Sequence, residues 1–135
     1  MGAKVGLSVE AYLRTSFPDL DKEYRDGELE ERTLPTYLHG RTQGRLFAFF
    51  GALPKSLFVF PAVETRMQLA PGRFLIPDVA VFYPNEPGPV PDFPPLVAME
   101  VLSPDDRLAA VLAKLEEYRA WGVPHVWLVD PDARK

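Results

Sequence analysis

The sequence contains no cysteine among its 135 residues. A chain without cysteine forms no disulfide framework, no Cys-based zinc site and no thiol nucleophile, and a reducing compartment is its natural location. It also lacks any run of about 20 apolar residues, the length that a membrane helix needs. Residues 1–10 lack the basic-then-apolar order of a signal peptide. We therefore expect a cytoplasmic protein that has no association with a membrane.

Neither sign of charge is in large excess, because 15 Lys and Arg residues stand against 19 Asp and Glu residues and the formal net charge is −4. Hydrophobic residues make up 47% of the chain, which is too many for a disordered segment. A chain of this length can build a hydrophobic core without disulfides, but it is too short for two full domains. The expected organisation is a single domain over residues 1–135.

Proline is abundant, and its distribution is uneven. The 15 prolines are about twice the average usage, and they cluster in the run PNEPGPVPDFPP between Pro84 and Pro95. Each proline removes an N–H donor and restricts the residue before it, so this run can be neither helix nor central strand. It predicts a surface loop between two apolar segments.

The first half of the chain predicts two helices with a hairpin between them; the expected ranges are a helix over 8–15, strands over 22–25 and 28–32, and a helix over 35–53. Ser8 is a suitable N-cap for the first helix. Asp26-Gly27 between two short extended runs is a strong hairpin signal. In the longer helix, apolar residues recur at helical spacing, and Pro35 falls in the first turn, where its missing N–H does no harm.

The second half predicts strands on both sides of a further helix; the expected ranges are strands over 56–69, 73–83 and 95–104, a helix from Ser103 to Gly122, and a strand over 125–131. The short turn at Pro71-Gly72 favours an antiparallel pair. Ser103, Pro104 and Asp106 are the expected helix start. The expected core stripe of that helix is Leu108, Val111, Leu112, Leu115 and Tyr118. Strand, helix and strand in about 35 residues favour a parallel crossover. The predicted fold class is therefore α/β (α+β), a mixed sheet flanked by helices.

Two carboxylates interrupt the most strand-like segments. Asp78 lies inside FLIPDVAVF, and Glu100 lies inside LVAMEVL. An ionised carboxylate taken out of water costs several kcal/mol unless something compensates it. If the two strands are neighbours with matching faces, the carboxylates converge, and a hard divalent cation is the simplest compensation. A single acid in a strand is more often a salt-bridge partner or an edge residue, so that interpretation stays open for each of them.

The residues around these acids resemble a known family. IPDVAVF around Asp78, MEVLSP around Glu100, and the run KLEEYRAWGVPHVWLVDP are similar to the PD-(D/E)XK nuclease superfamily. More narrowly they resemble the Uma family of putative restriction endonucleases, over residues from about Glu23 to Pro131. The resemblance implies a restriction-endonuclease-like core and divalent-metal-dependent cleavage of DNA. It also implies that such a nuclease cuts both strands as a homodimer or higher homo-oligomer.

The resemblance assigns roles to individual residues. It implies that Asp78 and Glu100, with the Val101 carbonyl, hold Mg²⁺ or Mn²⁺, and that Glu23 is a further acid at the site. Lys114 matches the family's lysine on the helix after the EVLSP strand, and the resemblance implies that it substitutes for the superfamily's strand lysine and would orient a water molecule or stabilise charge on the phosphate. On ideal helix geometry Lys114 lies about 110° round from the stripe of Leu108, Leu112 and Leu115, at the edge of the predicted buried face. From there its side chain can reach a site or simply extend into solvent.

A basic segment is the candidate DNA surface. Residues 33–63 contain no acid, whereas Arg41 and Arg45 are basic. By resemblance, His39 occupies the place of a histidine at the start of the long helix; it can contact phosphate, position an acid or cap the helix, and contact with the nucleic acid is the role assigned to it. We therefore expect these three residues to face DNA.

The chain departs from the family pattern at two positions, and these keep a second hypothesis open. Leu102 stands where the superfamily has a strand lysine, and Ala110 stands where family members often have an aspartate. The chain is also expected to be short at its C-terminus relative to such proteins. The alternative is therefore a catalytically inactive nuclease-fold module that binds DNA or protein.

Overall fold

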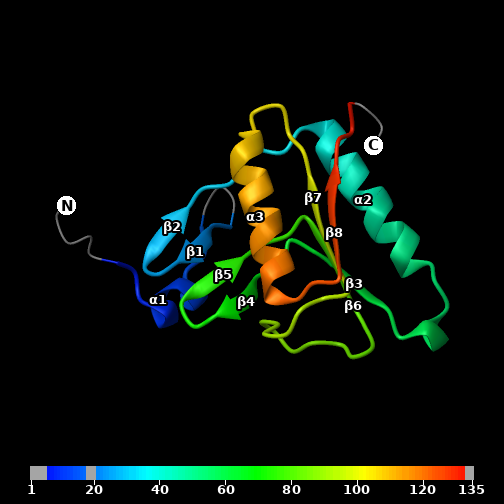
Figure 1. Ribbon diagram of the computed structural model, residues 1–135, viewed down its shortest axis with the longest axis horizontal. Helices are drawn as coiled ribbons and strands as arrows, with labels where there is room; N and C mark the ends of the chain where they lie inside the picture. The colour runs from blue at the N-terminus through cyan, green and yellow to red at the C-terminus, as the bar shows by residue number, and fades with distance from the viewer. Residues whose placement is uncertain (1–5, 18–20, 133–135) are drawn as a thin grey trace.

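The computed structural model describes residues 6–17 and 21–132, and within them the strands form two four-stranded sheets with helices packed beside them (Figure 1). The elements in chain order are α1 (Val9–Arg14), β1 (Glu23–Arg25), β2 (Glu28–Glu30), α2 (Tyr37–Gly51), the 3₁₀ turn η1 (Lys55–Leu57), β3 (Phe60–Val63), β4 (Met67–Ala70), β5 (Arg73–Leu75), β6 (Val79–Phe82), β7 (Val97–Val101), α3 (Leu108–Trp121) and β8 (His125–Val129). The sheet orders are β2-β1-β5-β4 and β3-β6-β7-β8. The predicted α+β class is confirmed. In the described part of the chain no helix is both long and apolar enough to cross a membrane.

The N-terminal elements form as predicted. Ser8 caps α1, because its hydroxyl accepts a hydrogen bond from the Ala11 N–H at 3.1 Å. The β1–β2 hairpin turns at Asp26 and Gly27, whose φ angles are 51° and 94°. Positive φ at both turn positions suits the right-handed twist of the flanking strands. The hairpin therefore places Glu23 in a short strand beside β5.

The expected antiparallel pair of long strands is present, but each strand is broken. The segment 56–69 contains the 3₁₀ turn and two strands, β3 and β4, and the segment 73–83 contains β5 and β6. β4 pairs with β5 in the first sheet, and β3 pairs with β6 in the second. The breaks lie at Glu64, where φ is 49°, and at Pro77, which has no N–H for a ladder. A continuous strand was therefore the wrong prediction, and Asp78 lies at a junction between the sheets.

The second sheet contains the predicted parallel crossover. β7 pairs in parallel with β8, and α3 connects them. Figure 1 shows α2 and α3 on opposite sides of these strands. Leu46 and Phe50 of α2 pack against the buried face that includes Val81 and Met99. Tyr118 and other α3 residues pack against the other face, which includes Ala98. Since alternate residues of a strand share a face, Glu100 points to the α3 side with Ala98.

Both long helices begin later than predicted. Thr36 caps α2 at the His39 N–H, so Pro35 lies before the helix and not in its first turn. α3 begins at Leu108, because Ser103 and Asp106 form a separate turn. In that turn the Asp106 carboxylate accepts a hydrogen bond from the Ser103 N–H at 2.7 Å.

The buried face of α3 is rotated relative to the prediction. Leu108 and Leu112 are 53% and 49% exposed, so they are not core residues. The helix instead turns Lys114, Leu115 and Tyr118 inward, with Tyr118 fully buried. These positions follow the i, i+1, i+4 pattern of one helical face. Lys114 is consequently on the inner face and not on its edge.

Candidate active site

The sheet junction brings two acids together at the ends of neighbouring strands. The β6–β7 ladder pairs Val79 with Met99, and the Asp78 N–H donates to the Met99 carbonyl at 3.0 Å. One step further along this register, Asp78 lies next to Glu100. Both side chains are buried, and both line a cavity of about 330 Å³. The structure therefore brings the two strand acids to one place.

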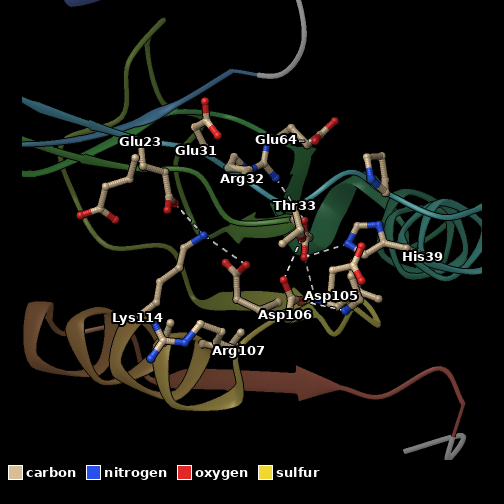
Figure 2. A pocket seen from close by; sticks show the side chains of 18 of the residues that line it. Glu23, Glu31, Arg32, Thr33, His39, Glu64, Asp105, Asp106, Arg107 and Lys114 are labelled. Atoms are coloured by element: carbon tan, nitrogen blue, oxygen red, sulfur yellow. Dashed lines mark hydrogen bonds and ion pairs between the residues drawn. The ribbon is translucent and has the colours of Figure 1, made fainter.

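Lys114 connects two of the predicted site residues. Its Nζ lies 2.6 Å from Glu23 Oε2 and 3.2 Å from Glu100 Oε1, and it donates to the Ile76 carbonyl at 2.9 Å. Figure 2 shows Lys114 reaching from α3 toward Glu23. Glu23 Oε2 also accepts the Ile76 N–H at 2.7 Å. Of the two open possibilities for Lys114, the structure has the one in which its side chain reaches the site.

Asp78 is held by a different set of groups. Its Oδ2 accepts the Val101 N–H at 2.7 Å and lies 3.3 Å from His39 Nε2. Its Oδ1 lies 3.2 Å from Arg32 Nη2. Arg32 Nη1 in turn lies 3.1 Å from Glu64 Oε1. Arg32 therefore ties the buried acid to a carboxylate at the edge of the cavity.

The sequence did not indicate Arg32 as a site residue, and it indicated a core position for Tyr118 more than a site role. No pattern around Arg32 in EERTLPT indicated a site residue, since its partners are distant in sequence. Tyr118 was expected mainly as a core residue, yet its hydroxyl also donates to Glu100 Oε2 at 2.9 Å. Its position four residues after Lys114, on the same helical face, was the available signal.

Burial and hydrogen bonds compete in setting the pKa values of the site. It raises the pKa of Glu100 to about 8, against partial opposition from Lys114, while the nearby charges of Asp78 and Glu23 raise it further. Burial also disfavours the charged form of Asp78, but hydrogen bonds from His39 and the Val101 N–H outweigh it and lower the pKa of Asp78. The hydrogen bond to Asp78 raises the pKa of His39.

Lys114 keeps its charge despite burial. Burial alone would lower the pKa of Lys114, but the Glu100 and Glu23 carboxylates together raise it. In the buried cluster three carboxyl groups thus face two basic side chains, Arg32 and Lys114. Both strand acids are therefore salt-bridge partners of the protein's own cations, an interpretation that the sequence left open beside a metal site.

The donor chemistry of the cavity fits a hard divalent cation. Asp78 and Glu100 supply carboxylate oxygens, which Mg²⁺ prefers, and Val101 lines the same cavity. Within residues 6–17 and 21–132, however, no three acidic or histidine side chains are placed to hold a metal ion by themselves. Any such ion would therefore need the backbone or water as further ligands.

The three residues expected to contact DNA do not form one surface. His39 is buried beside Asp78, and its Nδ1 has no hydrogen-bond partner among the described residues. Arg41 and Arg45 instead line a second hollow of about 750 Å³ between α2 and the end of β8. Exposed Phe49 lies in the same hollow. His39 consequently belongs to the acidic cavity, and the two arginines belong to a separate surface of α2.

Comparison with known proteins gives a family and a fold. A family model described as "Uma2: Putative restriction endonuclease" matches residues 9–135. A solved structure described as a putative nuclease belonging to DUF820 from Anabaena variabilis ATCC 29413 is similar, with a TM-score of 0.79 and 21% identity over 93% of this chain and 75% of that one. At this identity the likeness shows a shared fold. No curated protein sequence matches the chain.

Proposed function

Because this chain belongs to the Uma2 family of putative restriction endonucleases, we propose that it is a metal-dependent endonuclease that hydrolyses DNA phosphodiester bonds at the cavity lined by Asp78 and Glu100. The family match supports a nuclease.

One observation carries this proposal, namely that four separate elements deliver complementary residues to one cavity. Glu23 comes from β1, Asp78 from the junction just before β6, Glu100 from β7 and Lys114 from α3, and all four line the cavity. A buried carboxylate lowers the stability of the fold unless a cation or hydrogen bonds compensate it, so three of them in one cavity need an explanation. Clusters of this kind in a cleft are typical of active sites.

Mg²⁺ or Mn²⁺ is the proposed cofactor. Asp78 and Glu100, with the Val101 carbonyl, would hold it through hard oxygen ligands. When bound, such an ion activates water as a nucleophile and offsets negative charge that develops on the phosphate. The remaining work falls to the residues around these ligands.

Lys114 and its neighbours orient the acids. Lys114 fixes Glu100 Oε1, while the Tyr118 hydroxyl fixes Oε2, so the carboxylate has one defined orientation. Glu23 positions Lys114 at 2.6 Å and thereby acts through it. An ammonium group held in this way is a compact charge suited to phosphate oxygens. The long side chain of Lys114 thus supplies from the helix the positive charge that Leu102 does not supply from the strand.

The DNA contacts are proposed to lie on α2. Arg41 and Arg45 present positive charge on a helix whose sequence neighbourhood, residues 33–63, has no acid. Such charges bind the phosphate backbone without regard to base sequence. Cleavage of both strands would need two copies of the chain, so a homodimer is part of the proposal.

A specific observation favours the inactive module as second candidate. Both strand acids are already paired with cations of the chain, Asp78 with Arg32 and Glu100 with Lys114. Ala110 lines the cavity and supplies no carboxylate there, at the position where the family resemblance implies an aspartate. A protein of this kind would bind DNA or protein without cutting.

Plasmid nicking with Mg²⁺ or Mn²⁺ distinguishes the two candidates. We expect nicking by the wild type, and its loss in Asp78→Asn and Glu100→Gln, since the amides keep the shape of the side chain but cannot ionise to serve as carboxylate ligands. Glu86→Gln, in an exposed loop away from the cavity, is the matched control and should nick normally. Equal nicking by wild type and Asp78→Asn would contradict the assigned site.

Divalent-metal binding provides the second readout. Mn²⁺ should raise the melting temperature of the wild type and of Glu86→Gln, but not of Asp78→Asn. The absence of both nicking and any metal-dependent shift in the wild type would favour the inactive module.

A further inference from the structure

We propose that Arg32 is a built-in competitor of the metal ion, which holds the Asp78 carboxylate in the metal-free protein and must release it before a divalent cation binds. This inference rests on the proposed metal-dependent function. The Arg32 side chain is only 12% exposed, and its guanidinium lies between Asp78 and Glu64 at 3.2 and 3.1 Å. Figure 2 shows Arg32 and Glu64 close together beside the cavity.

The two oxygens of Asp78 are not equivalent. Oδ2 is used by the Val101 N–H and lies beside His39, so its lone pairs have partners within the fold. Oδ1 has Arg32 as its ion-pair partner. Oδ1 is therefore the oxygen best placed to bind an incoming cation. A guanidinium and a divalent cation on the same oxygen repel each other strongly in a buried site.

Arg32 is the displaceable cation, and Lys114 is not. Lys114 is held by Glu23, Glu100 and the Ile76 carbonyl, so its departure would leave three buried acceptors without their donor. Arg32 has an alternative partner in Glu64, whose side chain is 42% exposed. It can therefore leave Asp78 and keep an ion pair at the edge of the cavity.

The test is Mn²⁺ affinity in the absence of DNA, measured by titration calorimetry or by the electron paramagnetic resonance signal of free Mn²⁺. We expect Arg32→Gln to bind Mn²⁺ about tenfold or more tightly than the wild type, because a repelling charge is removed from the ligand oxygen. Arg25→Gln is the matched control. Arg25 lines the same cavity with a side chain 20% exposed, but it pairs with Glu117 and Glu30 and not with either proposed ligand.

A double variant keeps the test valid if Arg32→Gln folds poorly. Arg32→Gln with Glu64→Gln removes one charge of each sign and leaves no unpaired Glu64. It should also bind Mn²⁺ more tightly than the wild type. Cooperative unfolding in urea without metal establishes that each variant used is folded.

Each result has a distinct meaning. Tighter binding by Arg32→Gln with little change in Arg25→Gln supports the inference, and so does binding that appears only in Arg32→Gln. Equal tightening in both variants overturns it, because net charge alone would explain the effect. Binding by the wild type that Asp78→Asn abolishes and Arg32→Gln leaves unchanged overturns the role of Arg32 while the proposed metal site stands. If no protein binds Mn²⁺, the inference and the proposed metal site both fail.

Discussion

Replacement of Glu100 by glutamine tests the electrostatics of the cavity most directly. Glutamine keeps the shape of the side chain but cannot ionise. In the folded protein, burial raises the pKa of Glu100 from 4.5 to about 8. The folded protein therefore favours the protonated carboxyl at pH values where the unfolded chain already carries the charge.

The sign and size of the effect follow from linkage. As pH rises from 4.5 to about 8, the unfolded state loses the Glu100 proton first, so the wild type loses stability across this window. The loss amounts to about 1.4 kcal/mol per pH unit, or about 5 kcal/mol over the whole window. Above pH 8 both states are ionised, and the loss ends. The glutamine variant lacks this contribution, so its stability relative to the wild type should rise over the same window.

Urea denaturation in EDTA measures this difference. The free energy of unfolding of both proteins should be compared at several values from about pH 5 to about pH 9. Any change in hydrogen bonding to Lys114 or Tyr118 adds an offset that does not vary with Glu100 ionisation, so the slope is the quantity to follow. If the difference in the free energy of unfolding between the two proteins does not change with pH over this range, the claim that burial raises the pKa of Glu100 is refuted.

Three further predictions address the other parts of the structure. Lys114→Met should destabilise the protein by about 3–5 kcal/mol in urea denaturation, because Glu23 and Glu100 lose a buried cation; a loss below about 1 kcal/mol would contradict the observed contacts. Leu115→Ala should cost about 2–3 kcal/mol and Leu112→Ala less than about 1 kcal/mol, since only the former packs in the core; losses of similar size at both positions would restore the predicted stripe. Arg41→Glu with Arg45→Glu should weaken duplex DNA binding about tenfold or more and flatten its salt dependence while Mn²⁺ affinity stays the same; unchanged binding would exclude α2 as the DNA surface.

Local signals in the sequence were sufficient for several elements. The Asp26-Gly27 turn, the Ser8 cap and the strand–helix–strand crossover all depend on residues close together in the chain. Backbone preferences and hydrophobic periodicity act over such short distances. Asp78 and Glu100 were also detectable, because a carboxylate inside an apolar run is a local anomaly. Their arrival at one cavity then followed from the pairing of β6 with β7.

Features that depend on distant contacts escaped prediction. The apolar pattern of α3 permitted two inward faces, and packing against the sheet selected the one that contains Lys114. The break at Pro77 became a junction only because β5 and β6 join different sheets.

The sequence by itself determined the approximate positions of the helices, the hairpin and the parallel crossover, and which two acids are out of place in apolar segments, but not where the long strands break. Only the tertiary structure decided which cation neutralises each acid. Arg32 and Asp78 are 46 positions apart in the sequence. Glu23 lies on β1 of the first sheet, whereas its partner Lys114 lies on the helix α3. An ion pair depends on distance in space, and no local preference of the chain encodes a distance between segments so far apart.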